Sequence, residues 1–215
     1  MGLRKRLRQG QMDRQKLLNS VIIKVPISGH QKNEFTILVK LKGGAFMRSE
    51  WVPKGEIEHI LAALRPENRL ACEISLFTGL RIGDVLALKT SQIVKQRFTL
   101  REQKTGKTRT IRLPKDLYTR AMTCAGQFYV FEHRCDGRRH RTRQAVYKDL
   151  KRVADLFGVK KQLSPHSLRK VYAVEEYLHC GSLVRVQKLL NHSSEAVTML
   201  YAMANVVSRR KNFHR

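Results

Sequence analysis

The sequence has few acidic residues: 17 Asp and Glu stand against 43 Lys and Arg, which gives a formal net charge of +26 over 215 residues. An excess of one sign destabilises a compact chain by self-repulsion unless a polyanion usually accompanies it. Nucleic acid is the favoured partner, because each phosphate that a cation neutralises releases counterions. Hydrophobic residues make up 42% of the chain, which is enough for a real core and excludes wholesale disorder.

Long apolar runs are also missing from the chain. No stretch approaches the roughly 18 apolar residues of a membrane helix, and M-G-L-R-K-R-L-R at the N-terminus lacks the apolar run of a secretory signal. The basic residues form no amphipathic helix with an aromatic stripe. We therefore expect a soluble, cytoplasmic protein that does not bind membranes.

Cysteine is scarce, and its spacing indicates no special chemistry. The four cysteines form no C-x-x-C pair, and intracellular chains seldom carry structural disulfides. A zinc site would have to use Cys124, His133, Cys135 and His140, but their spacings match no standard finger. We predict that the chain has no metal site.

Composition changes along the chain, and we place a domain boundary near residue 50. The first 16 residues hold six basic residues and one acid, and the runs 21–27 and 35–41 have the alternation of a β-hairpin. Residues 1–50 are thus predicted to form a basic arm with a hairpin. Residues 51–215 are predicted to form the main domain.

The main domain has mostly helical periodicity, with short segments of period two. Alternation predicts strands over 93–101 and 108–113 and a short strand at 128–131. We expect a fold that is mainly α with a small antiparallel β-sheet. The predicted helices begin at Pro53 and near Leu80 and cover 68–77, 115–125, 142–157, 165–179, 183–190 and 195–204.

Cationic and proton-transferring side chains occur beside the predicted helix starts and turns. They comprise two guanidiniums, one ammonium, two imidazoles and one phenol, from Arg81, Lys104, His166, Arg169, His192 and Tyr201. This set suits phosphodiester cleavage without a metal ion. Arginines can hold the non-bridging oxygens, a tyrosine can attack phosphorus, and imidazole and ammonium groups can transfer protons.

Each of these residues also has an ordinary structural interpretation. Arg81 could be a surface charge paired with Asp84, Lys104 an exposed turn residue, and Tyr201 a core aromatic between apolar neighbours. Paired carboxylates, which a two-metal nuclease needs, are missing from these places. The combination favours catalysis, and we expect neither a cofactor nor a metal ion.

Four segments in chain order resemble the tyrosine recombinases, the phage-integrase family: T-G-L-R-I-G-D-V-L-A-L at 78–88, K-T-G-K-T-R-T-I-R-L-P at 104–114, H-S-L-R at 166–169 and L-L-N-H-S-S-E-A-V-T-M-L-Y at 189–201. The resemblance covers about residues 50–205. It implies the tyrosine recombinase catalytic domain fold, in a short form without the usual core-binding domain. It gives the catalytic roles to the six residues named above and makes Asp84 the acidic support of the first arginine.

The resemblance implies a site-specific DNA recombinase that integrates, excises or inverts a DNA segment through a 3′-phosphotyrosyl intermediate. Tyr201 would attack the scissile phosphate while Arg81 and Arg169 hold its oxygens. The partner would be a duplex recombination site, occupied by a homotetramer whose subunits are monomers when free. The gene would be bacterial, archaeal or carried by a phage or mobile element.

The resemblance also implies the remaining roles at the phosphate. His166 would take part in proton transfer, and His192 would hydrogen-bond the phosphate. Lys104 would protonate the leaving oxygen and is preferred to Lys107, because it precedes T-G as in the family. DNA binding is expected to depend on a basic run consisting of Arg134, Arg138, Arg139, Arg141, Arg143, Lys148, Lys151 and Arg152.

Two other functions share parts of this pattern. One is a DNA-binding accessory or regulatory protein that keeps the fold but exchanges few strands. The other is an enzyme like the type IB topoisomerases, which would use the same chemistry to relax supercoils. A recombinase should form a covalent adduct with DNA that is lost in Tyr201→Phe, whereas an accessory or regulatory protein should form no adduct.

Overall fold

The computed structural model describes residues 20–26, 34–40 and 51–190. The chain divides into two units, Met1–Arg48 and Ser49–Arg215. In the first unit, β1 (Ser20–Pro26) pairs antiparallel with β2 (Glu34–Lys40), so that Ser20 lies opposite Lys40. A hairpin therefore occupies the segment where the alternation predicts one, with each strand beginning one residue earlier.

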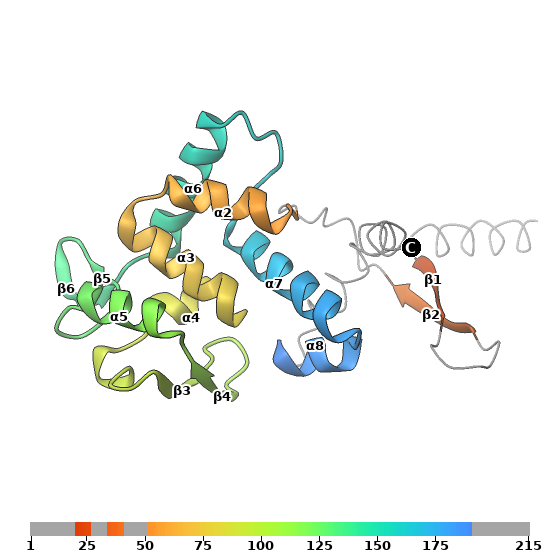
Figure 1. The fold of residues 1–215 in the computed structure, drawn as a ribbon, viewed down its shortest axis with the longest axis horizontal. Helices are drawn as coiled ribbons and strands as arrows, with labels where there is room; N and C mark the ends of the chain where they lie inside the picture. The colour runs from red at the N-terminus through yellow and green to blue at the C-terminus, as the bar shows by residue number, and fades with distance from the viewer. Residues whose placement is uncertain (1–19, 27–33, 41–50, 191–215) are drawn as a thin grey trace, which may run out of the picture. The chain divides into compact units, whose positions relative to one another are not determined.

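The second unit is mainly helical with small antiparallel sheets, which confirms the predicted fold class (Figure 1). None of the described helices combines the length and the apolar character needed to cross a membrane. The predicted helix at 195–204 lies outside the described residues. The elements are α2 (Lys54–Ala62), α3 (Pro66–Thr78), α4 (Ile82–Leu86), the 3-10 helix η1 (Thr90–Gln92), β3 (Arg97–Arg101), β4 (Thr108–Arg112), α5 (Lys115–Cys124), β5 (Glu132–His133), β6 (Asp136–His140), α6 (Arg143–Leu156), α7 (Pro165–Cys180) and α8 (Leu183–Leu189).

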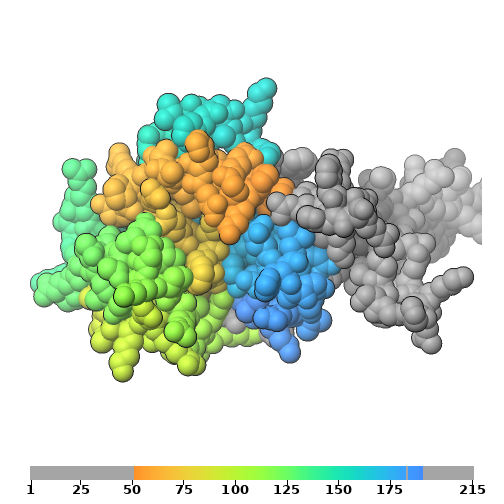
Figure 2. All heavy atoms as spheres, viewed as in Figure 1, coloured from red at the N-terminus to blue at the C-terminus, as the bar shows by residue number. Residues whose placement is uncertain are grey.

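Helix α3 is the centre of this unit and packs against α2, α4, α5, α6 and α7. Figure 2 shows α2, α5 and α7 meeting around it on one face. Pro66 suits the first turn, where its missing N–H has no intrahelical partner to lose. Leu70 and Ile74 are buried in the core, and so are the polar Asn68 and Ser75, because neighbours surround this helix.

The β3–β4 hairpin packs one face on the core and leaves the other in solvent. Phe98 and Leu100 are buried, and Ile111 lies opposite Phe98 in the register. Strand β3 begins later than the predicted residue 93, because the chain first forms η1 and buries Ile93 behind it. The hairpin thereby holds its connecting turn beside α4.

The predicted strand at 128–131 is reduced to one isolated antiparallel bridge, in which Tyr129 pairs with Lys89. The Thr90 amide donates to the Phe128 carbonyl and the Val130 amide to the Leu88 carbonyl, and Val130 and Phe131 are buried. The strands lie just after this segment, where β5 and β6 pair with an irregular register. Their sequence, rich in Arg and His, has no apolar alternation to reveal them.

Candidate active site

Arg81 lies in the turn between α3 and α4, at the N-cap position of α4. Helix α3 ends at Gly79, whose φ of 67° is in the left-handed region that glycine tolerates. Two side chains of α3 fix the turn: Ser75 Oγ donates to the Leu80 carbonyl over 2.8 Å, and Thr78 Oγ1 accepts from the Leu80 amide. The sequence T-G-L-R thus ends one helix and presents Arg81 at the start of the next.

Lys104 lies in the turn between β3 and β4. The amide of Glu102 donates to the Lys107 carbonyl over 2.9 Å, and the amide of Gly106 donates to the Glu102 carbonyl over 2.9 Å. The amide of Gln103 donates to Asp84 Oδ1 over 2.9 Å, so the turn is attached to α4 immediately before Lys104. Lys104 itself is exposed.

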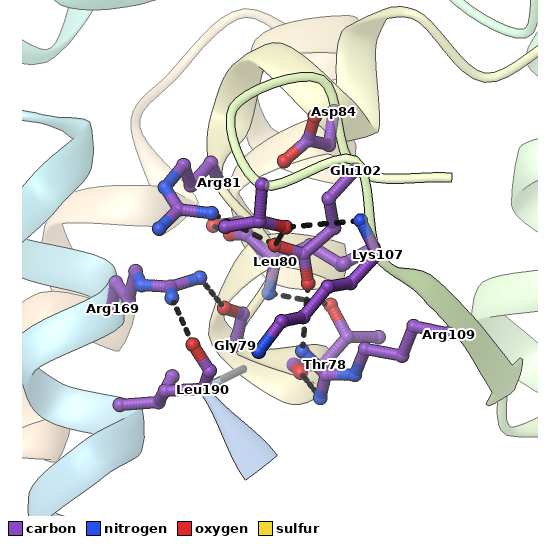
Figure 3. Close-up of polar contacts among 12 residues, drawn as sticks. Thr78, Gly79, Leu80, Arg81, Asp84, Glu102, Lys107, Arg109, Arg169 and Leu190 are labelled. Atoms are coloured by element: carbon purple, nitrogen blue, oxygen red, sulfur yellow. Dashed lines mark hydrogen bonds and ion pairs between the residues drawn. The ribbon is translucent and has the colours of Figure 1, made fainter. Parts of the chain in front are cut away.

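His166 and Arg169 lie one turn apart on α7. Ser164 caps this helix by accepting a hydrogen bond from the His166 amide, and Pro165 occupies the first turn. His166 is exposed, whereas Arg169 is buried. The Arg169 guanidinium donates to two backbone carbonyls, Gly79 O and Leu190 O, and so connects α7 to the α3–α4 turn and to the end of α8 (Figure 3).

A single cavity of about 410 Å³ brings these predicted residues together. Four of its side chains are cationic against one carboxylate, a balance that suits a phosphate group. His192 and Tyr201 lie outside the described residues, after Leu190. The cavity is lined by Arg81, Ile82, Gly83, Asp84, Gln103, Lys104, Arg143, Pro165, His166 and Arg169.

A buried carboxylate, Glu102, lies beneath the cavity and binds Arg81. Its side chain is 0% exposed, and its Oε2 accepts from Arg81 Nη1 over 2.8 Å and from Thr105 Oγ1 over 3.2 Å. Its Oε1 lies 3.9 Å from Arg109 Nη1. Figure 3 shows Arg81 and Arg109 reaching Glu102 from different directions. Arg109 also donates to the Thr78 carbonyl, which links the hairpin to the end of α3.

Asp84 faces the cavity from the first turn of α4. Burial raises the pKa of this carboxyl, and the nearby Glu102 adds to the rise, whereas the Gln103 amide and the charges of Arg81 and Arg169 act against it. That Asp84 supports Arg81 stays a prediction. Its direct hydrogen bond, however, holds the hairpin turn through the Gln103 amide.

The sequence did not lead us to place three residues at this site, namely Glu102, Arg109 and Arg143. Glu102 had a usable signal: in β3 the buried side chains alternate at Phe98 and Leu100, and position 102 continues that phase. A carboxylate at a core position requires a cationic partner. Arg109 and the placement of Arg143 in the cavity had no such signal, because both depend on contacts between distant segments.

The basic run predicted to bind DNA separates into different environments. Arg134, Arg138 and Arg139 are exposed on or beside the β5–β6 hairpin, and Lys148 and Lys151 are exposed on α6.

Two other members of that run hold the fold together. Arg141 Nε donates to Asn68 Oδ1 over 2.5 Å, and Arg152 Nη2 donates to the Ala63 carbonyl over 3.3 Å while it pairs with Asp149 on its own helix. Arg143 differs again, since its aliphatic stem covers Gly83 at the cavity wall.

Across the described residues, no three His, Cys, Asp or Glu side chains are grouped as a metal site would require.

The family model of the phage integrases matches residues 50–207, most of the chain. The chain belongs to the phage integrase family. Among its relatives in this family, the integrase of Escherichia phage P2 is 28% identical over 152 residues, covering 71% of this chain and 42% of the relative. Tyrosine recombinase XerA of Pyrococcus furiosus is 30% identical over 161 residues, covering 71% of this chain and 52% of the relative.

Solved structures of phage integrases and Xer recombinases share the fold. A lambda integrase dimer bound to a COC′ core site matches with a TM-score of 0.60 and 22% identity, over 75% of this chain and 62% of that one. The XerH recombinase in its post-cleavage complex with a difH substrate matches with a TM-score of 0.58 and 21% identity, over 77% and 51% of the two chains.

The phage integrase family membership confirms the resemblance drawn from the four sequence segments. The named relatives are integrases and recombinases, so neither an accessory regulator nor a type IB topoisomerase is favoured. The chain spans about half the length of the curated relatives that it matches.

Proposed function

We propose that this protein is a site-specific DNA recombinase that breaks and rejoins strands through a covalent tyrosine intermediate. The observation that carries the proposal is the cavity in which Arg81, Lys104, His166 and Arg169 meet from three separate parts of the chain. Spacing alone does not require residues so distant in sequence to share one cavity. Their chemistry matches what a phosphodiester needs during cleavage.

The proposed reaction begins when the Tyr201 hydroxyl attacks the scissile phosphorus. A bond forms between the tyrosine oxygen and phosphorus, and the bond from phosphorus to the 5′-oxygen breaks. His166 receives the tyrosine proton, and Lys104 gives a proton to the 5′-oxygen, which leaves as a hydroxyl. Attack by a 5′-hydroxyl on the phosphotyrosyl bond reverses these steps and rejoins a strand.

The guanidiniums of Arg81 and Arg169 are proposed to stabilise charge on the two non-bridging oxygens. Their contacts support this role, because Glu102 holds Arg81 and two backbone carbonyls hold Arg169, and a fixed donor stabilises developing charge without reorganising first. His192 is proposed to add a hydrogen bond to the same phosphate. The preference for Lys104 over Lys107 is supported by the cavity, whose lining includes the first of these lysines.

We extend the proposal to the organisation of the chain. Residues 51–215 would form the catalytic domain and residues 1–50 a basic arm, a division supported by the two units of the chain and by the matched range 50–207. The substrate would be duplex DNA carrying a recombination site, in the chromosome or in a mobile element within the cytoplasm. Free monomers would assemble into a tetramer on the recombination site. Sedimentation of the free protein and of its complex with DNA measures both states.

The decisive experiment is a covalent-adduct assay on a nicked suicide substrate, in which the released fragment diffuses away and traps the intermediate. The wild-type protein should form an adduct that survives denaturing electrophoresis, and Tyr201→Phe should form none. Tyr177→Phe is a matched control, because this half-buried tyrosine lies on α7 and loses the same hydroxyl. Adduct formation by Tyr201→Phe would remove this residue as the nucleophile.

A further inference from the structure

We propose that Glu102 is a positioning residue for DNA cleavage, acting through Arg81. The proposal rests on the function proposed above and assigns a role to a residue that the six catalytic positions do not include. Glu102 is fully buried, and its carboxylate binds Arg81 Nη1 over 2.8 Å. It does not line the cavity, so its carboxylate acts on the phosphate through the arginine that it holds.

The geometry makes Glu102 a junction between two catalytic cations. Its side chain holds the Arg81 guanidinium, while its backbone N–H and C=O close the turn that carries Lys104. The position of Arg81 is thereby tied to the same residue that sets the start of the lysine turn. Arg109 reinforces this junction, because it lies near the second carboxylate oxygen and donates to Thr78 O.

The carboxylate of Glu102 weakens the binding of a phosphate in the cavity, and we propose that holding Arg81 in place outweighs this loss. A negative charge beneath a phosphate site weakens the attraction between that site and the phosphate. If Glu102 acted on DNA only through its charge, removing that charge would strengthen binding or speed cleavage. If it positions Arg81, the same change slows cleavage. The two roles therefore predict opposite signs for one substitution.

The test is Glu102→Gln, which keeps the shape of the side chain and removes its charge. We expect the cleavage rate at saturating DNA to fall roughly 10- to 100-fold, the range that a misplacement of about 1 Å produces, while the Kd for duplex DNA changes little. Glu73→Gln is the matched control, because Glu73 also binds two arginines, Arg69 over 2.7 Å and Arg120 over 2.6 Å, away from the cavity. Its cleavage rate should stay at the wild-type value.

A double-mutant cycle identifies the residue through which Glu102 acts. When Arg81→Lys has already removed the guanidinium, adding Glu102→Gln should slow cleavage little further. Fully additive losses would show that Glu102 acts elsewhere and would overturn the proposal. A cleavage rate of Glu102→Gln equal to or above the wild-type rate would overturn it as well.

A measurement without DNA separates this proposal from the proposed function. In the free protein, NMR of the arginine side chains should show slow hydrogen exchange at the Arg81 guanidinium, identified by its loss in Arg81→Lys. Glu102→Gln should speed that exchange, and Glu73→Gln should leave it unchanged. Unchanged exchange in Glu102→Gln overturns the positioning role, even where cleavage falls. A faster exchange in a protein that forms no adduct supports the contact and contradicts the recombinase function instead.

A second variant covers the case in which Glu102→Gln does not fold. Glu102→Asp keeps the charge but withdraws the carboxylate by about one carbon–carbon bond, ~1.5 Å. We expect faster exchange at Arg81 and a cleavage defect in this variant too. Wild-type values for both would show that the carboxylate need not contact Arg81 in the observed geometry and would overturn the proposal.

Discussion

Asp84 and Glu102 are two carboxylates placed within a cationic site, and their surroundings differ. Glu102 binds two cationic side chains, Arg81 and Arg109. Asp84 accepts one backbone hydrogen bond, from Gln103, and in the described part of the chain its Oδ2 is buried without a hydrogen-bond partner. Burial and the neighbouring Glu102 together raise the pKa of Asp84 above its ordinary value.

The raised pKa of Asp84 predicts a stability cost near neutral pH. The folded protein binds the Asp84 proton more tightly than the unfolded chain does, so stability falls as pH rises from the unfolded pKa of 3.8 through the folded value. Asp84→Asn cannot ionise and still offers an oxygen to the Gln103 amide. Its free energy of unfolding should exceed that of the wild type at pH 7, and the difference should shrink toward pH 3.

Urea denaturation at several pH values measures this difference. A less stable Asp84→Asn at pH 7 would mean that attraction to Arg81 and Arg169 outweighs the cost of burial. The predicted gain in stability belongs to a familiar pattern, since active sites often keep groups that destabilise the fold. If Asp84→Asn is the more stable protein, Asp84 is retained for its effect on the hairpin turn and on Arg81 and not for stability.

The individual site residues could be predicted where a local motif contains them. Arg81, Lys104, His166 and Arg169 each follow or occupy a recognisable turn or helix start, and all of them line the cavity. The sequence does not show the contact between Glu102 and Arg81, because it joins residues 21 positions apart on different elements. The alternation of buried residues in strand β3 was the signal that would have predicted a charged partner for Glu102.

At the scale of elements, the turn between α3 and α4 depends on Gly79. Its positive φ allows α3 to end and the chain to reverse toward Arg81. Its missing side chain leaves room for the ring of Tyr172, which lies where a Cβ would be. Two separate physical reasons therefore require glycine at this position.

These reasons predict that Gly79→Ala lowers the free energy of unfolding by about 2–5 kcal/mol. About 1–2 kcal/mol comes from placing alanine in the left-handed region, and roughly 1–3 kcal/mol comes from the overlap with Tyr172. Gly158→Ala is a matched control: its φ is +63°, but nothing lies within 4 Å of its added Cβ. That variant should lose only the first contribution.

Urea denaturation of both variants measures the two contributions separately. Equal losses in Gly79→Ala and Gly158→Ala would show that the Tyr172 ring moves aside at little cost. Because Gly79 also offers its carbonyl to Arg169, a displaced turn should reduce adduct formation in Gly79→Ala. Gly158 lies outside the cavity lining, and its variant should keep that activity.

The helices could be predicted well, and the short strands less so. Apolar spacing fixes a helix face, and α5, α6 and α7 fall within one or two residues of the predicted ranges 115–125, 142–157 and 165–179. The β5–β6 hairpin was missed because none of its strand residues is buried and most are charged, so no buried face imposes a pattern. Its pairing is set by the turn and by contacts with neighbouring segments.

At the scale of the whole molecule, the net charge of +26 has several distinct uses. Arg81, Lys104 and Arg169 converge on one cavity. Arg141 binds Asn68 and Arg152 donates to the Ala63 carbonyl, and both contacts join distant segments of the chain. The exposed arginines of the β5–β6 hairpin remain as candidates for the DNA backbone, because β6 ends three residues before Arg143 at the cavity wall.

Salt dependence distinguishes charges that contact phosphate from charges that only raise the net charge. Each phosphate contact that is lost reduces the slope of log K against log salt by about 0.9. Arg138→Gln with Arg139→Gln should therefore weaken duplex binding and reduce the slope by about 1.8. Lys54→Gln with Lys161→Gln removes the same charge, but these lysines lie beside Glu58 and Glu56. Their variant should keep the wild-type slope.

Binding of a labelled duplex across a salt series measures both slopes. Equal reductions in the two double variants would mean that DNA responds to the total charge and that the hairpin has no privileged contact. A reduction confined to the hairpin variant would place the DNA backbone along β6. In that case adduct formation at saturating DNA should stay near the wild-type rate, since Arg138 and Arg139 lie outside the cavity and act by holding the duplex against it.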